Sequence, residues 1–175
     1  MSKVWYGNLT NRLEEGKNYT GREIAVGDDI TMYHYSDRTC YYVTAVEDQK
    51  RIQVRRYYTC ADHDKPGGMG HQDWMYFKTW DEWNQYLAKY FPDHHDTSAH
   101  REEPEAETWV FRYGKWMKEY RYFSETYENK DLKWTYHATE KEKQSLAKKG
   151  YFCQYFNLSG KVSFGVRDYY YDWEF

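Results

Sequence analysis

The residues that most often build a protein core are scarce in this chain. Leu, Ile, Val and Phe together number 25 of 175 residues, a share that often accompanies disorder. The net charge of −3 argues against disorder, because disordered chains usually also carry strong self-repulsion. The missing apolar volume is supplied by 21 Tyr and 8 Trp. We therefore expect a folded protein with an aromatic core and a tyrosine-rich surface. The surface tyrosines either serve a protein interface or are present simply because tyrosine is common in β-strands.

Cysteines and long apolar runs are also few. Three cysteines form an odd, sparse set, which does not describe a secreted disulfide scaffold and favours a reducing cytosol. The N-terminal stretch "MSKVWYGNLTNRLEEG" has no signal-like pattern, and no run approaches the roughly 18 apolar residues of a membrane span. We expect a cytoplasmic protein without a membrane segment, whose slight acidity offers no global field for attracting nucleic acid.

Short alternating segments dominate the first part of the chain. Residues 22–59 alternate apolar and polar side chains around the turn "EDQK", and "DWMYF" returns as a strand after a polar loop at 62–72. Several short strands at this spacing suggest a small, strongly curved barrel. The expected fold class is therefore α+β: a small antiparallel SH3-like or OB-like β-barrel, or a curved sheet, with a few short helices.

Helix signals occur at three places. "NLTNRLEEG" predicts a helical turn or two near the N-terminus. "TWDEWNQYLAKYF" predicts a helix over 79–91, and "ATEKEKQSLAKKG" predicts a shorter charged helix that ends at Gly150. Both of these begin with a Thr-x-x-Glu capping box, which satisfies free N–H groups of the first turn.

Three parts follow from these patterns. Residues 1–91 read as a β-rich domain with one helix, and 92–107 as a flexible acidic linker, because it holds six acidic and no large apolar residues. Residues 108–175 predict a hairpin at Gly114–Lys115, a short helix and C-terminal strands that close or extend the first sheet. In the last strand, Val162 and Phe164 are expected to point inward and Ser163 outward.

The stretch "YYTCADHDKPGGMGHQDWMYF" gathers metal-ligating residue types around a glycine-rich turn. Structural zinc needs four N or S ligands, and no second C-x2-C pair supports that reading. The competing interpretation, which we favour, is a solvated hairpin loop with no cofactor. The zinc candidates are Cys60, His63 and His71, with a fourth ligand from Cys40, His34 or Asp73.

Two catalytic readings of the same loop remain open. Asp62, Asp64 and the two histidines could hold a divalent ion for hydrolysis of nucleic acid or of a nucleotide signal. Cys60 could pair with a histidine as a nucleophile. No P-loop, GxGxxG, HExxH or GxSxG motif occurs in the chain, so we predict no catalytic residues.

Basic and aromatic residues interleave in "QKRIQVRRYY". Arg51 and Arg55 alternate onto one strand face, where they could contact phosphates or an acidic protein, or simply form a solvated face. A nucleic-acid-binding small barrel is therefore an alternative function, with tyrosines stacking on bases. The candidate binding residues are Arg38, Lys50, Arg51, Arg55, Arg56, Tyr57 and Tyr58.

Several stretches carry a resemblance: "WYGNLTNRLEEG", "VGDDITMYHYSDRTCYYVTAVEDQKRIQVRR", "CADHDKPGGMGHQDW" and "KVSFGVRDYYYDWEF". They resemble a family of uncharacterised accessory proteins of phages, prophages and other mobile elements of Firmicutes. The resemblance spans most of the chain except 92–107 and 124–150. It carries over no functional residue, because the family has no assigned chemistry.

The resemblance implies an accessory phage protein in the host bacterial cytosol. Such proteins are often inhibitors of host defence, including anti-CRISPR proteins. We therefore expect a non-catalytic binder of a host protein or ribonucleoprotein complex. The expected target is a CRISPR effector nuclease, whose basic channel a mildly acidic, aromatic protein could occlude.

Overall fold

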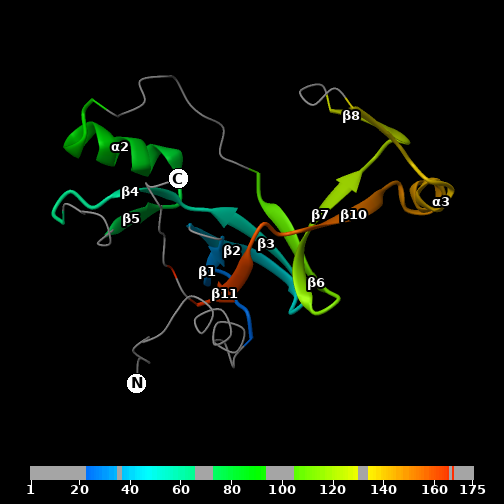
Figure 1. The fold of residues 1–175 in the computed structure, drawn as a ribbon, viewed down its shortest axis with the longest axis horizontal. Coiled ribbons are helices and arrows are strands. Elements are labelled where there is room, and N and C mark those ends of the chain that lie inside the picture. Colours follow the sequence, from blue (N-terminus) through cyan, green and yellow to red (C-terminus); the bar gives the residue numbers. More distant parts are fainter. Residues whose placement is uncertain are drawn as a thin grey trace.

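The computed structural model describes residues 23–34, 37–65, 73–93, 105–129, 134–165 and 167. Within these ranges the fold is α+β, dominated by antiparallel strands and with two helices (Figure 1). The N-terminal helix predicted in "NLTNRLEEG", His71, residues 94–104 of the predicted linker and the aromatic tail at 168–175 lie outside the described residues.

Seven strands form one sheet in the order β10-β7-β6-β3-β2-β1-β11, with every neighbouring pair antiparallel. Because β3 pairs with β6, strands from before and after the predicted linker share this sheet. The hairpins predicted at "EDQK" and near Gly114 both form, joining β2 to β3 and β6 to β7. The strands are β1 (Asp29–Tyr33), β2 (Arg38–Asp48), β3 (Arg51–Arg56), β6 (Glu107–Arg112), β7 (Lys115–Tyr122), β10 (Phe152–Asn157) and β11 (Lys161–Phe164).

The sheet is strongly curled, because its two edge strands are neighbours in the sequence. Only residues 158–160 separate β10 from β11, so the facing ends of these strands lie at most about 15 Å apart. Six strand spacings in a flat sheet would separate them by roughly 29 Å. The curl gathers one apolar core from five strands, namely Ile30, Met32, Val43, Ile52, Val54, Trp109 and Phe164.

Gly160 lets the chain cross from one edge of the sheet to the other. A Cβ at Gly160 would lie 2.1 Å from the carbonyl oxygen of Tyr33, which no side chain could tolerate. Beyond this point β11 pairs with β1, so the C-terminal strand extends the sheet, one of the two outcomes the sequence predicts. Ser163 alternates with Phe164 onto the other face of the strand, as expected, but the solvent exposure expected there is wrong, because Ser163 is fully buried beside Thr31, which is fully buried as well.

The closed barrel, one of the two architectures that the sequence predicts, is wrong. Within the described residues the sheet stays open, since β10 and β11 are its edges and make no ladder with each other. The strands β4 (Tyr58–Ala61) and β5 (Trp74–Phe77) leave the sheet and pair separately. The chain turns away at Tyr57, whose backbone N–H donates to the Cys40 carbonyl and whose hydroxyl donates to Asp29 Oδ1 at 2.7 Å.

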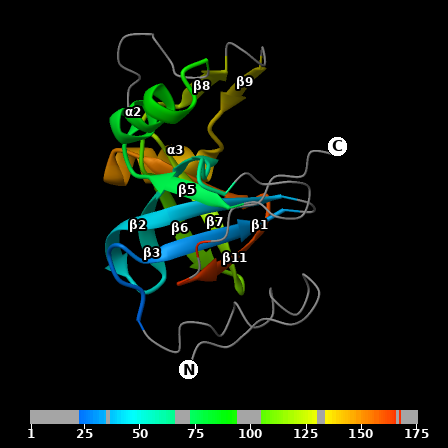
Figure 2. The same cartoon turned by 90° about the vertical axis from the view of Figure 1, so that its left-hand side faces the viewer.

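The helix α2 (Trp80–Tyr90) packs on β4 and β5, as Figures 1 and 2 show. It begins where the sequence predicts, with the Thr79 side chain accepting the Glu82 backbone N–H. Its buried residues, Trp80 and Leu87, are apolar and seven positions apart, as an amphipathic helix requires.

The ends of β7 and β10 extend away from the sheet and carry β8 (Thr126–Asn129), β9 (Trp134–His137) and α3 (Glu140–Lys149) (Figure 1). We call this part the arm (residues 120–129 and 134–156). The predicted helix that ends at Gly150 is confirmed as α3, with both hydrogen bonds of its capping box present. Gly150 takes the left-handed conformation, with φ 79°, that ends the helix.

Candidate partner-binding surface

Four aromatic rings of the arm are open to solvent. They come from β7, from the turn after it, from β8 and from β10. We call them the arm cluster, and their exposed fractions are 40% for Tyr120, 73% for Phe123, 40% for Tyr127 and 47% for Phe156. Isolated exposed apolar side chains are ordinary, whereas rings gathered on one surface indicate an interaction site.

The arm cluster lines an open groove of about 640 Å³. Tyr120 and Phe156 meet edge to face with ring centroids 5.3 Å apart, and Tyr122 and Tyr127 do so at 5.2 Å. These contacts restrain Tyr120, Tyr127 and Phe156, so a partner docking on these three rings would lose less side-chain entropy. Arg121 also lines the groove, which places a cation beside the rings.

A second aromatic group lies between α2 and the β4–β5 hairpin. We call it the helix cluster; its side chains are half-buried and are Tyr58, His63, Phe77, Trp83, Tyr86 and Tyr90. The Trp83 indole N–H donates to the Thr59 carbonyl at 3.1 Å. The Tyr86 hydroxyl accepts the His63 backbone N–H at 3.1 Å. Because their polar atoms are paired within the protein, these rings serve packing.

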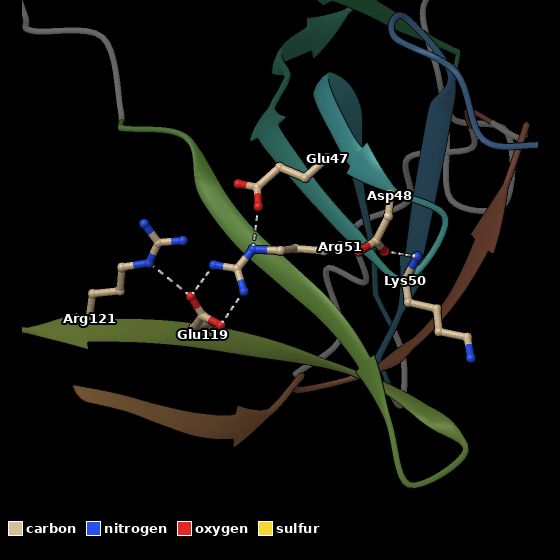
Figure 3. Close-up of polar contacts among 6 residues, drawn as sticks. All are labelled: Glu47, Asp48, Lys50, Arg51, Glu119 and Arg121. Atoms are coloured by element: carbon tan, nitrogen blue, oxygen red, sulfur yellow. Dashed lines mark hydrogen bonds and ion pairs between the residues drawn. The ribbon is translucent and has the colours of Figure 1, made fainter. Parts of the chain in front are cut away.

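Arg51, one of the candidate binding residues, forms part of an ion-pair network (Figure 3). Its guanidinium makes two hydrogen bonds to the Glu119 carboxylate, one of them 2.9 Å long, and its Nε lies 2.6 Å from Glu47. Arg121 Nε donates to the same Glu119 at 3.1 Å. The side chain of Glu119 is fully buried, so this network joins β2, β3 and β7 at the base of the arm.

The pKa shifts agree with this pairing. Burial by itself would raise the pKa of Glu119, but hydrogen bonds from Arg51 and Arg121 outweigh it and hold the pKa below its usual value. Burial by itself would lower the pKa of Arg51, and the bonds to Glu119 raise it instead. Arg51 therefore serves the protein's own carboxylates first, leaving less of its charge for a ligand.

The other basic residues among the binding candidates lie apart from one another. Lys50 is exposed in the β2–β3 turn, and Figure 3 shows its side chain extending away from the Glu119 network. Arg55 and Arg56 lie toward the other end of β3 and, as consecutive strand residues, on opposite faces of the sheet. Arg38 begins β2 and is partly exposed. The structure therefore does not assemble these four cations into one patch.

The two tyrosines proposed to stack on bases differ in accessibility. Tyr57 is 5% exposed and packs between the rings of Tyr42 and Tyr76. Burial and the hydrogen bond to Asp29 raise its pKa. Tyr58 is half-buried and packs on Trp83, with ring centroids 5.9 Å apart.

The loop that carries the candidate metal ligands and the candidate cysteine nucleophile is hydrogen-bonded to α2. The Tyr86 hydroxyl and His63 Nδ1 are 2.9 Å apart, and His63 Nε2 lies 2.9 Å from Asp64 Oδ1. Both ring nitrogens are thus occupied, and the ring also stacks on Tyr90. Burial, and then the charge of Asp62, raise the pKa of the Cys60 thiol to about 11, so it is protonated at neutral pH and not activated as a nucleophile.

The proposed zinc ligands do not converge within the described residues. There, the group of side chains close enough to share a cation consists of Asp62, His63 and Asp64, all three from the same loop. Cys60, Cys40, His34 and Asp73 are not part of it. Cys40 is buried in β2, where its sulfur lies 4.0 Å from Thr31 Oγ1.

Sequence reasoning missed the arm cluster. Its rings stand at the end of the strand expected up to residue 123, in the ambiguous stretch that follows it, and in β10. The density of aromatic residues in "YRYFSETY" was the available signal. That signal does not distinguish buried rings from exposed ones, because exposure depends on which element covers them.

Comparison with protein-family models, with curated proteins and with solved structures finds no match to this chain. Within the part of the chain that the structure describes, no helix combines the length and the apolar character needed to cross a lipid bilayer.

Proposed function

We propose that this chain is a non-catalytic binding protein that docks on its target through the arm cluster. The observation that carries the proposal is the set of four exposed rings on one preformed groove. Aromatic residues dominate binding energy at protein interfaces, because they bury a large area with few rotatable bonds.

The proposed target is a bacterial defence complex, with an RNA-guided CRISPR effector nuclease as the first class to examine. The resemblance of the sequence to phage accessory proteins supports this choice of target and the host cytosol as the place of action. Inhibition would follow if docking covers the effector's nucleic-acid channel or blocks a movement required for cleavage.

The test is co-purification with a panel of effector nucleases, joined to a DNA-cleavage assay. The double variant Phe123→Ser/Tyr127→Ser should bind at least about tenfold more weakly and inhibit less, because it removes two interface rings. Val26→Ser is the matched control, since Val26 is 65% exposed and lies outside the arm. It should leave binding and inhibition unchanged.

Two outcomes would count against the proposal. Absence of binding and inhibition across the whole panel removes the effector nuclease as the target. Full activity of the double variant removes the arm cluster as the docking surface. Circular dichroism of each variant separates loss of binding from loss of fold.

A further inference from the structure

The turn between β6 and β7 holds an unusual residue. Arg112 pairs with Lys115, so Tyr113 and Gly114 form a two-residue turn, with φ 52° and 74°. Two positive φ angles match the type I′ turn, whose first position favours Asn, Asp or Gly. Among the described non-glycine residues, Tyr113 is the one with positive φ. A tyrosine here costs stability, and such strain points toward a functional role.

Tyr113 is also the most exposed large apolar side chain described, at 83%. Its backbone places the ring beyond the end of the sheet, where it contributes little to the core. The Arg112 guanidinium lies over it, 5.5 Å from the ring centroid, and over the Tyr155 ring at 4.1 Å. Tyr155 thus holds the Arg112 guanidinium beside the exposed Tyr113 ring. Arg112 and Tyr113 together form a planar cation–aromatic pair at the tip.

Two further cations stand beside this pair. Lys115 is exposed directly opposite Arg112 in the hairpin. Lys50 is exposed in the β2–β3 turn. The Phe111 backbone N–H donates to the Lys50 carbonyl at 2.7 Å, which ties this turn to β6. Figure 3 shows this turn beside the β6–β7 hairpin.

One carboxylate in the same turns faces these cations. Asp48 is exposed, and its Oδ1 accepts the Lys50 backbone N–H. Three cations against one carboxylate leave the tip with a local charge of +2, opposite in sign to the chain's −3. We call Lys50, Arg112, Tyr113 and Lys115 the hairpin tip.

We propose that the hairpin tip binds single-stranded nucleic acid, with a base stacking on Tyr113 and the three cations contacting phosphates. Every base has a face that can stack on an exposed ring, and flanking cations follow the backbone. An acidic peptide would use the cations but has no need of a strained ring. The site goes beyond the proposed docking function, because its four residues lie outside the arm and include none of the arm cluster.

The test is fluorescence anisotropy with labelled oligo-dT and oligo-U probes of about 20 nucleotides. Three phosphate contacts predict that binding weakens roughly twentyfold between about 50 mM and about 200 mM salt, from a log–log slope near −2. The DNA and RNA probes show whether the site distinguishes the two backbones. An oligoglutamate peptide serves as the acidic competitor.

Tyr113→Asn is the decisive variant. It removes the ring and installs a residue that favours the turn, so the melting temperature should rise while probe binding falls about tenfold. Tyr113→Phe keeps the ring and should bind like the parent chain. Lys115→Gln should weaken binding and reduce the salt slope by about 0.7.

Three results would overturn the proposal: no binding of either probe at about 50 mM salt, unchanged binding by Tyr113→Asn, or equal competition by oligoglutamate. The Phe123→Ser/Tyr127→Ser variant should bind the probes normally, whereas Tyr113→Asn should still capture the protein target. The two proposals can therefore fail independently.

Discussion

The helix cluster and the arm cluster are both built from aromatic residues, yet they have different surroundings. In the helix cluster, α2 lies across the β4–β5 hairpin, and the polar atoms of Trp83, Tyr86 and His63 find partners within the protein. In the arm cluster, four rings line a groove that stays open. The difference indicates that aromatic residues serve packing in the first case and are available for docking in the second.

An element that covers the rings makes this difference. The helix α2 is amphipathic, buries Trp80 and Leu87, and packs on both strands of the hairpin. In the arm, α3 packs on β10 but has no buried residue and is strongly charged. It braces the strand through polar contacts, such as Gln154 Nε2 donating to Glu142 Oε1 at 3.3 Å, and leaves the rings open.

The largest effect is expected at Gly160, which shapes the curled sheet that supports both clusters. Gly160→Ala places a Cβ 2.1 Å from the Tyr33 carbonyl oxygen, so the backbone must move. We expect a loss of about 3 kcal/mol or more in unfolding free energy, measured by urea denaturation. The neighbouring Ser159→Ala should cost less than about 1 kcal/mol, since it loses one weak contact to Met32. Equal stability of the two variants would show that the strand crossing is not fixed as described.

The base of the arm should be nearly as sensitive. Glu119→Ala leaves Arg51 and Arg121 without their shared buried carboxylate, which should cost about 3 kcal/mol. Glu47→Ala removes a partner of Arg51 that is 42% exposed, and should cost less than about 1 kcal/mol. Thermal denaturation of both variants measures the contrast. Similar losses would mean that Glu119 is better solvated than its burial indicates.

A matched pair of substitutions compares the two clusters directly. Trp83→Ala removes a half-buried ring and its hydrogen bond to Thr59, which should cost about 2 kcal/mol. Phe156→Ala removes a ring that is 47% exposed and mainly meets Tyr120, which should cost less than about 1 kcal/mol. Partner binding should change in the opposite sense, with the larger loss for Phe156→Ala. The reverse order of stabilities would contradict the assignment of the clusters.

The smallest effect concerns pH and the attachment of α3. Burial tends to raise the pKa of Glu142, but hydrogen bonds from Tyr136, Thr139 and Gln154 lower it from 4.5 to about 2. A carboxyl group with a lowered pKa in the folded state stabilises the fold above its unfolded pKa. This contribution should be complete above pH 4.5 and decline as the pH falls toward 2.

Glu142→Gln isolates this contribution, because glutamine can still accept the capping hydrogen bonds. The stability difference between the parent chain and the variant should shrink as the pH falls from 4.5 toward 2. Chemical denaturation at several pH values measures it. A difference that stays constant with pH would mean that the carboxylate charge does not stabilise α3.

Local patterns in the sequence predicted the elements well. Both described helices begin at Thr-x-x-Glu segments, because the capping chemistry is contained within one turn. The hairpins at "EDQK" and near Gly114 also form as expected, because short connections restrict the pairing register. The choice between a closed barrel and an open curved sheet could not be made in this way, since nothing local marks Tyr57 as the residue where the chain leaves the sheet.

The sequence by itself determined the residue types, the helix caps, the turns and the abundance of Tyr and Trp. Tertiary structure decided how these residues are used. Arg51 was expected on an accessible basic face, but the curled sheet brings Glu119, 68 positions away, into hydrogen-bonding distance. Tyr57 is buried whereas Tyr113 is exposed, because burial depends on elements distant in the chain that come to lie over a ring. Such long-range contacts are properties of the assembled fold, and no local sequence pattern encodes them.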